Sequence, residues 1–517
     1  MISAGQPAIA PTFAAENIYR RYFVGGIVVI LSAGALWGAY LLWQVSRAES
    51  FTGVSIQAIN AHGHAQIFGW VGLFIMGFAY QALPRMWGVP LAGPHLAVMN
   101  FVLLMVSLGL STAGTALAET WSLAISAVVM GGLLQIIAVV IFMGQLAVVF
   151  ARSKERRSPS TAFVFAAMAW FAAMSAMNLW HGLALMQAES HDALLVQIST
   201  YQAALRDMQI HGLALCMILG VSMRFFPGMF GLAKTSAARG WWAFGLIQIA
   251  IIGEVVLLIG SRWTDSTAMA GGLIAPWLML AVAVGLVIAP WRLWRPMPKR
   301  CRSGKFVRIA FAWLTLSLAM LLFLPVYMVL RDMVFSHAYY GAMRHAITVG
   351  FISMMIMGVA GRVVPELRGW DVRTLRGMWG PFVLVNIGCA MRVASQVLTD
   401  WNDSAFDVIG FSGMLEVTGL AWWGVSLVVL MYQPQGPRQP CGPKGSEASL
   451  AVIDPEMRVN ELAEAHPQVR AVLGRLGFDS CCMGEKTLAQ ASILQGLEPQ
   501  AALRELQALL GNQNSVG

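Results

Sequence analysis

Residues 77–88 read Gly-Phe-Ala-Tyr-Gln-Ala-Leu-Pro-Arg-Met-Trp-Gly, and this stretch decides the fold because its pattern returns twice. Residues 220–231 read Gly-Val-Ser-Met-Arg-Phe-Phe-Pro-Gly-Met-Phe-Gly, and residues 358–369 read Gly-Val-Ala-Gly-Arg-Val-Val-Pro-Glu-Leu-Arg-Gly. One such motif is an ordinary helix exit, since glycine permits close packing and proline stops a helix. Three copies at nearly even spacing, with their prolines at Pro84, Pro227 and Pro365, predict an internal repeat.

Each motif ends a long apolar segment. The chain has 517 residues, of which 58% are hydrophobic and 11% charged, whereas a soluble domain carries about 25% charged residues. A membrane-spanning helix needs about 20 mostly apolar residues. Twelve segments qualify, at residues 24–44, 57–83, 95–117, 122–150, 161–187, 199–226, 240–260, 268–291, 307–330, 336–364, 379–398 and 405–432.

The motifs end the second, sixth and tenth of these segments, so the repeat is four helices long. We therefore predict an all-α membrane protein with twelve transmembrane helices in three pseudo-equivalent four-helix arcs. Many transporters show two six-helix halves or inverted repeats instead. A four-helix repeat therefore argues against a transporter fold of that kind. A small soluble helical domain follows the membrane part.

Positive charge predicts the orientation. Residues 1–433 carry 27 Lys and Arg, and 21 of them fall on one side if the amino terminus is cytoplasmic. This bias is the positive-inside signature, so we expect both termini in the cytoplasm. The net charge of +9 thus reports topology, and no nucleic-acid partner is expected.

The tail forms two further parts. Residues 434–449 are rich in Pro, Gly and polar residues, which is typical of a flexible linker. Residues 450–512 return to soluble composition with apolar positions at helical spacing. We predict three domains: a membrane domain at 1–433, the linker, and a cytoplasmic helical domain that carries the adjacent Cys481 and Cys482.

Several histidines share one depth in the bundle. At 1.5 Å per residue, His62, His64, His211 and His345 lie roughly 24 to 33 Å before the prolines of their helices. His181 and His337 are expected near the same height. Each alone could be a hydrogen-bonded core residue. Their common layer favours metal ligands, and His64 and His345 occupy the same repeat position, as for a bis-imidazole heme.

Charged residues extend the histidine layer. Arg206 and Arg344 coincide in the repeat and could pair with heme propionates, although snorkelling to water would also explain them. Glu254 could join His181 and His211 in a mixed site for copper or non-heme iron, or serve as a proton relay. Glu416 is a weaker candidate for the same roles as Glu254. We interpret Cys216 and Cys389 as packing residues.

Two helices carry a resemblance. The stretch 61–85, beginning Ala-His-Gly-His-Ala-Gln-Ile-Phe-Gly-Trp, resembles the heme-bearing second helix of the heme–copper oxidase and nitric oxide reductase superfamily. The stretch 344–362, beginning Arg-His-Ala-Ile-Thr-Val-Gly, resembles the matching helix of NnrS, a twelve-span family with heme and copper that is tied to nitric oxide stress. The resemblance implies heme axial ligands at His64 and His345, with His62 as the alternative to His64.

The resemblance has departures. An oxidase of this superfamily needs a second heme histidine on the tenth span and a histidine pair on the seventh. Here Met343 and Ile347 flank His345, and the seventh span has no histidine. A complete oxygen-reducing centre is therefore not expected.

The tail resembles a second family. Residues 476–484, Leu-Gly-Phe-Asp-Ser-Cys-Cys-Met-Gly, are similar to the amino-terminal domain of the ScdA/YtfE iron–sulfur repair proteins. Adjacent cysteines are poor disulfide partners, so metal, nitric oxide or redox exchange at Cys481 and Cys482 is the preferred interpretation. Two structural cysteines are the alternative.

The resemblances imply a bacterial inner-membrane heme protein of the nitrosative-stress response that binds or converts nitric oxide or another diatomic ligand in the lipid bilayer. Copper or non-heme iron could be a second cofactor. The protein could act as an oxidoreductase with an electron donor. A divergent nitric oxide reductase or terminal oxidase, and a heme or metal transporter, are the alternatives.

Overall fold

The computed structural model describes residues 17–155, 157–298, 301–368, 370, 372, 375–433 and 453–511, with gaps in the last range at 467–468, 470–471, 474–475, 479–482, 485 and 496. Twelve helices in this part are long and apolar enough to cross a membrane, which confirms the predicted number. Some spans begin earlier in the sequence than predicted. The first span begins at Ile18 and the sixth at His191, where Ser190 caps the helix by accepting the backbone N–H of Ala193.

The first arc contains spans one to four. Its elements are α2 (Ile18–Val29), η1 (Ile30–Gly34), α3 (Ala35–Ala48), η2 (Phe51–Gly53), α4 (Ile56–His64), η3 (Ala65–Gly72), α5 (Leu73–Trp87), α6 (Pro94–Ala116) and α7 (Ala124–Arg152).

The second arc contains spans five to eight. Its elements are α8 (Pro159–Met186), α9 (His191–Asp207), η4 (Met208–Leu215), α10 (Cys216–Phe230), α11 (Ala237–Thr264), α12 (Thr267–Gly272), α13 (Ile274–Ile288) and η5 (Ala289–Trp291).

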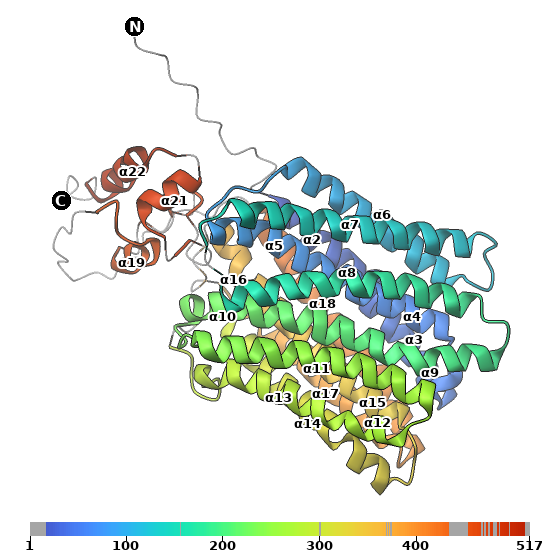
Figure 1. Cartoon of the computed structure of the whole chain (residues 1–517). Helices are drawn as coiled ribbons and strands as arrows, with labels where there is room; N and C mark the ends of the chain where they lie inside the picture. The colour runs from blue at the N-terminus through green and yellow to red at the C-terminus, as the bar shows by residue number, and fades with distance from the viewer. Residues whose placement is uncertain are drawn as a thin grey trace.

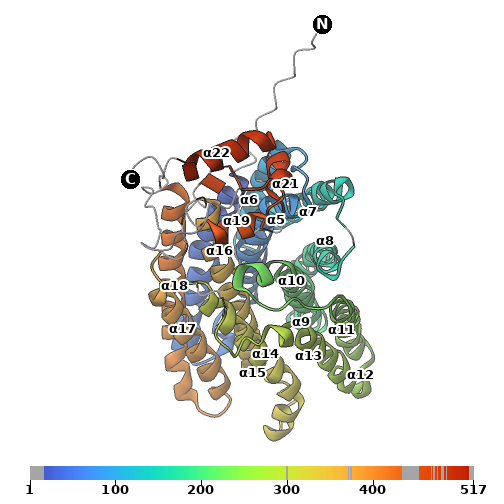
Figure 2. The same cartoon turned by 90° about the vertical axis from the view of Figure 1, so that its left-hand side faces the viewer.

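The third arc contains spans nine to twelve. Its elements are α14 (Gly304–Leu330), α15 (His337–His345), η6 (Ala346–Ser353), α16 (Met354–Leu367), α17 (Trp379–Leu398), η7 (Asp403–Ala405) and α18 (Phe406–Tyr432). In Figure 1 all the spans run side by side, and Figure 2 looks along them.

The second, sixth and tenth spans form the inside of the bundle. The most apolar 18 residues of these spans are 94%, 67% and 72% buried, whereas those of the other spans are at most 50% buried and so are largely left to lipid. These inner helices are the ones that end in the repeated motif and carry most of the histidine layer.

The first glycine of each motif is a contact point within its own arc. A Cβ on Gly77 would lie 2.5 Å from Cβ of Tyr22, one on Gly220 2.8 Å from Cβ of Phe163, and one on Gly358 3.0 Å from Cβ of Phe306. Tyr22, Phe163 and Phe306 belong to spans one, five and nine, the opening helices of the three arcs. The inner helix of each arc thus packs on the opening helix of that arc at the same place, which confirms three pseudo-equivalent arcs.

The second glycine of the motif ends the helix. Gly88 after α5 and Gly231 after α10 have φ of +75° and +70°, in the left-handed region that favours glycine at a helix end. Pro84 stays inside the last turn of α5. We call this end of the bundle the proline end, and the opposite half the histidine half.

The described part of the tail has its own apolar core. It includes α19 (Val459–Ala465), α21 (Leu488–Leu494) and α22 (Pro499–Gly511), which pack around Val459, Leu462, Leu488 and Leu506. These helices lie beside the proline end, near α5, α10 and α16 (Figure 1). Residues 434–449 fall outside the described residues.

Candidate functional site

Each inner helix contains a π-helical segment in the histidine half. The three segments, η3, η4 and η6, have equal length and the same register relative to the motif proline of their helix. A π-helical turn holds an extra residue and is often found at functional sites. The residues directly before the segments are His64, Asp207 and His345, so Asp207 occupies in the second arc the position that histidine holds in the other two.

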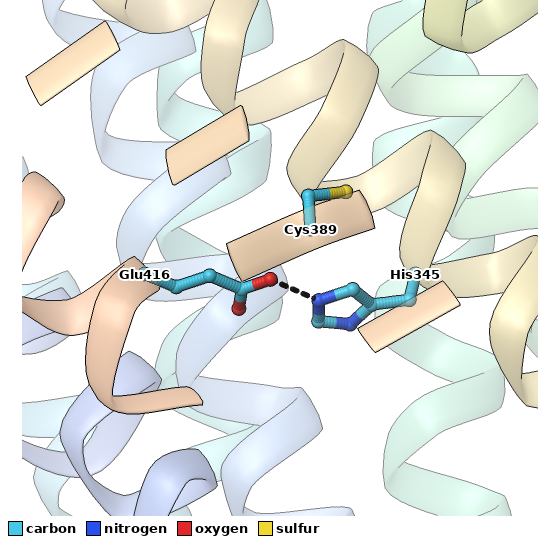
Figure 3. Close-up of side chains that lie close together, drawn as sticks. All are labelled: His345, Cys389 and Glu416. Atoms are coloured by element: carbon cyan, nitrogen blue, oxygen red, sulfur yellow. Dashed lines mark hydrogen bonds and ion pairs between the residues drawn. The ribbon is translucent and has the colours of Figure 1, made fainter. Parts of the chain in front are cut away.

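His345 belongs to a cluster inside the third arc. Its Nε2 lies 2.7 Å from Oε1 of Glu416 on α18. Cys389 on α17 completes a group of possible ligand atoms that all lie within 4.8 Å of one another. Figure 3 shows the Glu416 carboxylate reaching the imidazole directly, with Cys389 above the pair. Glu416 and Cys389 are buried, and the glycine at position 388 leaves room for the Glu416 side chain.

His62 turns toward the same side of the bundle. Its Nδ1 lies 3.0 Å from the carbonyl oxygen of Gly34 at the end of η1. Its ring lies against Gly38, where a Cβ would come within 2.4 Å of Cε1. His62 interacts electrostatically with His345, Arg206 and Arg392. We use the name third-arc chamber for the part of the bundle that holds His62, His345, Glu416, Cys389 and Arg392.

Arg392 supplies positive charge to this chamber. Its side chain is buried, and Nε and Nη1 have no hydrogen-bond partner among the residues that the structure describes. It interacts electrostatically with Glu416. Buried polar atoms are nearly always hydrogen-bonded, so two unpartnered guanidinium nitrogens indicate a missing acceptor. The sequence placed Arg392 within a span but assigned it no role.

A second cluster lies between the second and third arcs. His211 on η4 has Nδ1 2.9 Å from Oε2 of Glu254 on α11 and 3.9 Å from Oδ1 of Asp207. Arg344 forms an ion pair with Asp207 and a hydrogen bond with Tyr340. Asp207, His211 and Glu254 are all buried and could hold a metal ion. The sequence paired His211 with Glu254 correctly in space but missed Asp207.

The third member of the predicted mixed site lies elsewhere. His181 on α8 does not join the ligand group of His211 and Glu254 among the described residues. It lines a cavity of about 50 Å³ that also contains His64 and Arg206. The reason is the direction of its side chain on α8. His181 faces α9, where its Nδ1 accepts a hydrogen bond from the Nε2 amide group of Gln197. His64 contacts Asn178 on α8, so its imidazole turns toward the second arc.

The two arginines have different partners. Arg344 is neutralised by Asp207 inside the protein, whereas Arg206 donates to the amide oxygens of Asn60 and Gln209. His337 is exposed at the first turn of α15 and contacts Phe335, so it lies outside the buried layer. Cys481 and Cys482 lie outside the described residues.

A family comparison decides the classification. The family model described as NnrS protein matches residues 16–435. The chain belongs to the NnrS family. The match covers the twelve spans of this NnrS-family chain and stops before the tail helices, so it does not extend to the predicted ScdA-like domain. No curated protein matches the chain in sequence.

Solved structures show the same architecture. A chain from a cryo-EM structure of a heme-copper terminal oxidase dimer is similar with a TM-score of 0.61 and 15% sequence identity, covering 98% of this chain and 100% of that chain. At this identity the likeness concerns the fold. The NnrS-family chain therefore shares its overall fold with that heme-copper oxidase chain.

The third-arc chamber offers what a heme would require. The Gly34 carbonyl oxygen can accept a hydrogen bond from Nδ1–H of His62, which leaves Nε2 as a lone-pair donor, the usual arrangement of a metal-binding histidine. Gly38 makes space beside the ring. Arg392 holds two nitrogens without acceptors among the described residues, suited to a carboxylate. His62 and Arg392 fit the group, and His345 would offer Nδ1 to it, because its Nε2 lies against the Glu416 carboxylate.

Proposed function

We propose that this NnrS-family chain is a heme protein of the nitric oxide response, with the heme held in the third-arc chamber. The observation that carries the proposal is the pair of imidazoles on spans two and ten, His62 and His345, in one chamber with a buried, under-partnered Arg392. A heme would supply an iron centre for nitric oxide or another diatomic ligand. The family and the oxidase-like fold support this proposal.

The protein's own residues would position that group. Gly34 fixes the tautomer of His62 through its carbonyl oxygen. Glu416 orients His345 and adds negative charge beside it. Arg392 would pair with a propionate, since Arg forms strong bonds with carboxylates. Of the two histidines on span two, the geometry therefore favours His62 over His64.

The second cluster is our candidate for a second metal or a proton relay. Asp207, His211 and Glu254 give two carboxylates and one imidazole, a donor set suited to copper or non-heme iron. Arg344 offsets one negative charge. Glu254 Oε1 has no partner in the described part of the chain, so it is available either to a metal or to a transferred proton.

The oxidase-like fold favours one alternative, a redox enzyme that reduces nitric oxide or oxygen with an electron donor. Turnover would then accompany binding. A heme or metal transporter is the remaining alternative, and it would hold exchangeable metal below one equivalent.

Location and the tail complete the proposal. The 21 basic residues that the sequence pattern assigns to one side of the membrane support a bacterial inner-membrane protein with both termini in the cytoplasm. The ScdA-like tail would then present Cys481 and Cys482 to cytoplasmic thiols or nitrosylated iron.

The test is the optical spectrum of the purified, reduced protein before and after nitric oxide is added. We expect heme absorbance that shifts with nitric oxide at one equivalent per heme. Steady consumption of nitric oxide with an electron donor would favour the enzyme. Metal that exchanges freely and no heme absorbance would favour the transporter.

A further inference from the structure

A cavity between the first and second arcs is separate from both metal clusters. It is about 50 Å³ in volume and is lined by residues of α4, α6, α7, α8 and α9. This space suits a ligand of a few atoms. Its polar lining consists of Gln57, Asn60, His64, Ser111, Thr115, Asn178, His181 and Arg206. No carboxylate is among the described residues that line it.

Arg206 brings an uncompensated charge to the cavity. Nη1 donates to Oε1 of Gln209 over 2.9 Å, and Nη2 donates to Oδ1 of Asn60 over 3.1 Å. Both acceptors are neutral, and among the described residues no carboxylate forms an ion pair with Arg206. A buried charge without an opposite charge is costly, so this arrangement calls for an anion. The adjacent Gly63 has no side chain to displace the guanidinium.

Both histidines direct N–H donors at the cavity. The Nδ2 amide group of Asn178 lies 3.3 Å from Nδ1 of His64, and the Nε2 amide group of Gln197 lies 3.3 Å from Nδ1 of His181. An amide NH₂ can only donate, so each Nδ1 accepts and each Nε2 carries the proton. His64 and His181 are only 6% and 3% exposed.

Two donors at the cavity lack acceptors within the described part of the protein. His64 Nε2, His181 Nε2 and Ser111 Oγ are all buried. The Gln202 side chain is a hydrogen-bond partner for His181, so the donors without any acceptor beside them in the part of the chain that the structure describes are His64 Nε2 and Ser111 Oγ. The three donor residues line the same cavity. Unpartnered buried donors are rare, and two of them around one space, beside Arg206, indicate a shared acceptor.

Charge decides what that acceptor is. Arg206 interacts electrostatically with both His64 and His181, and its positive charge repels a metal cation. Protonated Nε2 atoms are donors and offer no lone pair to a metal. An anion with several oxygens, in contrast, accepts from every one of these groups.

We propose that this cavity is a receptor for a small monovalent oxyanion of the nitrite or nitrate class. Arg206 supplies the charge, and His64, His181 and Ser111 donate hydrogen bonds to the oxygens. The existence of an anion site is inferred from the geometry of these residues alone. The choice of nitrogen oxyanions among small anions rests on the proposed function, because these are the oxidised forms of nitric oxide.

The experiment is calorimetric titration of the purified full chain in lipid nanodiscs with nitrite, nitrate, chloride and zinc as separate probes. We expect one equivalent of nitrite or nitrate to bind more tightly than chloride. Arg206→Gln and His181→Gln should each weaken this binding at least about tenfold. Arg262→Gln, an exposed arginine near the end of α11, should leave it unchanged.

Several results would overturn the proposal. These are absence of binding by nitrite and nitrate in the wild type, equal affinity in Arg206→Gln, or zinc binding that His181→Gln abolishes. Arg206→Lys retains the charge and should keep part of the affinity, which separates loss of the site from loss of folding. Heme content measured in the same samples reports on the proposed function independently.

Discussion

His345 Nε2 and Glu416 Oε1 lie 2.7 Å apart across the third arc, linking the tenth span to the last one. The carboxylate fixes the direction of the imidazole and places a negative charge in a buried setting. Such a charge stabilises the oxidised, more positive form of a nearby metal centre. The position of α18 therefore affects both the direction of the His345 imidazole and the negative charge beside it.

Neutralising that charge should alter redox behaviour. Glu416→Gln keeps a side-chain oxygen for His345 but removes the charge, so we expect retained heme with a raised reduction potential, measured by spectroelectrochemical titration. Glu189→Gln, in an exposed loop, is the matched control. An unchanged potential in Glu416→Gln would place the carboxylate outside the heme environment.

Removing Arg344 should destabilise the protein. Arg344→Gln leaves Asp207 buried without its ion-pair partner, a loss of about 3–5 kcal/mol, visible as a lower unfolding temperature in detergent. The double variant Asp207→Asn with Arg344→Gln should recover part of this loss, because no charge is then left alone. Additive effects in the double variant would argue against a coupled pair.

The motif glycines should tolerate no side chain. Gly77→Ala places a Cβ 2.5 Å from Cβ of Tyr22, and such overpacking costs about 1–3 kcal/mol. Gly144→Ala on the lipid-facing side of α7 meets nothing within 4 Å and should be neutral or slightly stabilising, since alanine favours helices. Thermal unfolding of both variants measures the difference. Equal stability would refute the close contact.

The tail cysteines should act separately from the heme. Because the tail has its own core, Cys481→Ser with Cys482→Ser should leave heme content unchanged and lower the number of reactive thiols by two. Thiol titration beside the optical spectrum checks this. A loss of heme in this variant would instead connect the tail to cofactor binding.

The fold could be predicted because its signal repeats. The motif that ends in Pro84, Pro227 and Pro365 recurs at a four-helix period, and hydrophobicity marks each span. The π-helical segments could not be predicted, because apolar patterns do not record an extra residue in a helical turn. A related signal was nevertheless present, since each inner helix has a glycine at the same register before its proline, at positions 69, 212 and 350.

The site could be predicted only in part. Sequence identified the histidine layer and brought His211 together with Glu254. Asp207 could not be predicted from the histidine pattern, because a carboxylate stands in the second arc where the other two arcs have an imidazole. Which way His62 and His64 turn depends on packing against Gly38 and Asn178, and those contacts join helices that are distant in the sequence.

The heme-to-protein ratio of single histidine variants tests the central claim most directly. We predict about one heme per chain in the wild type, a large loss in His62→Ala and His345→Ala, and wild-type content in His337→Ala and His64→Ala. Folding of each variant is checked by size-exclusion chromatography. Wild-type heme content in His62→Ala and His345→Ala, or no heme in the native protein, would contradict the account.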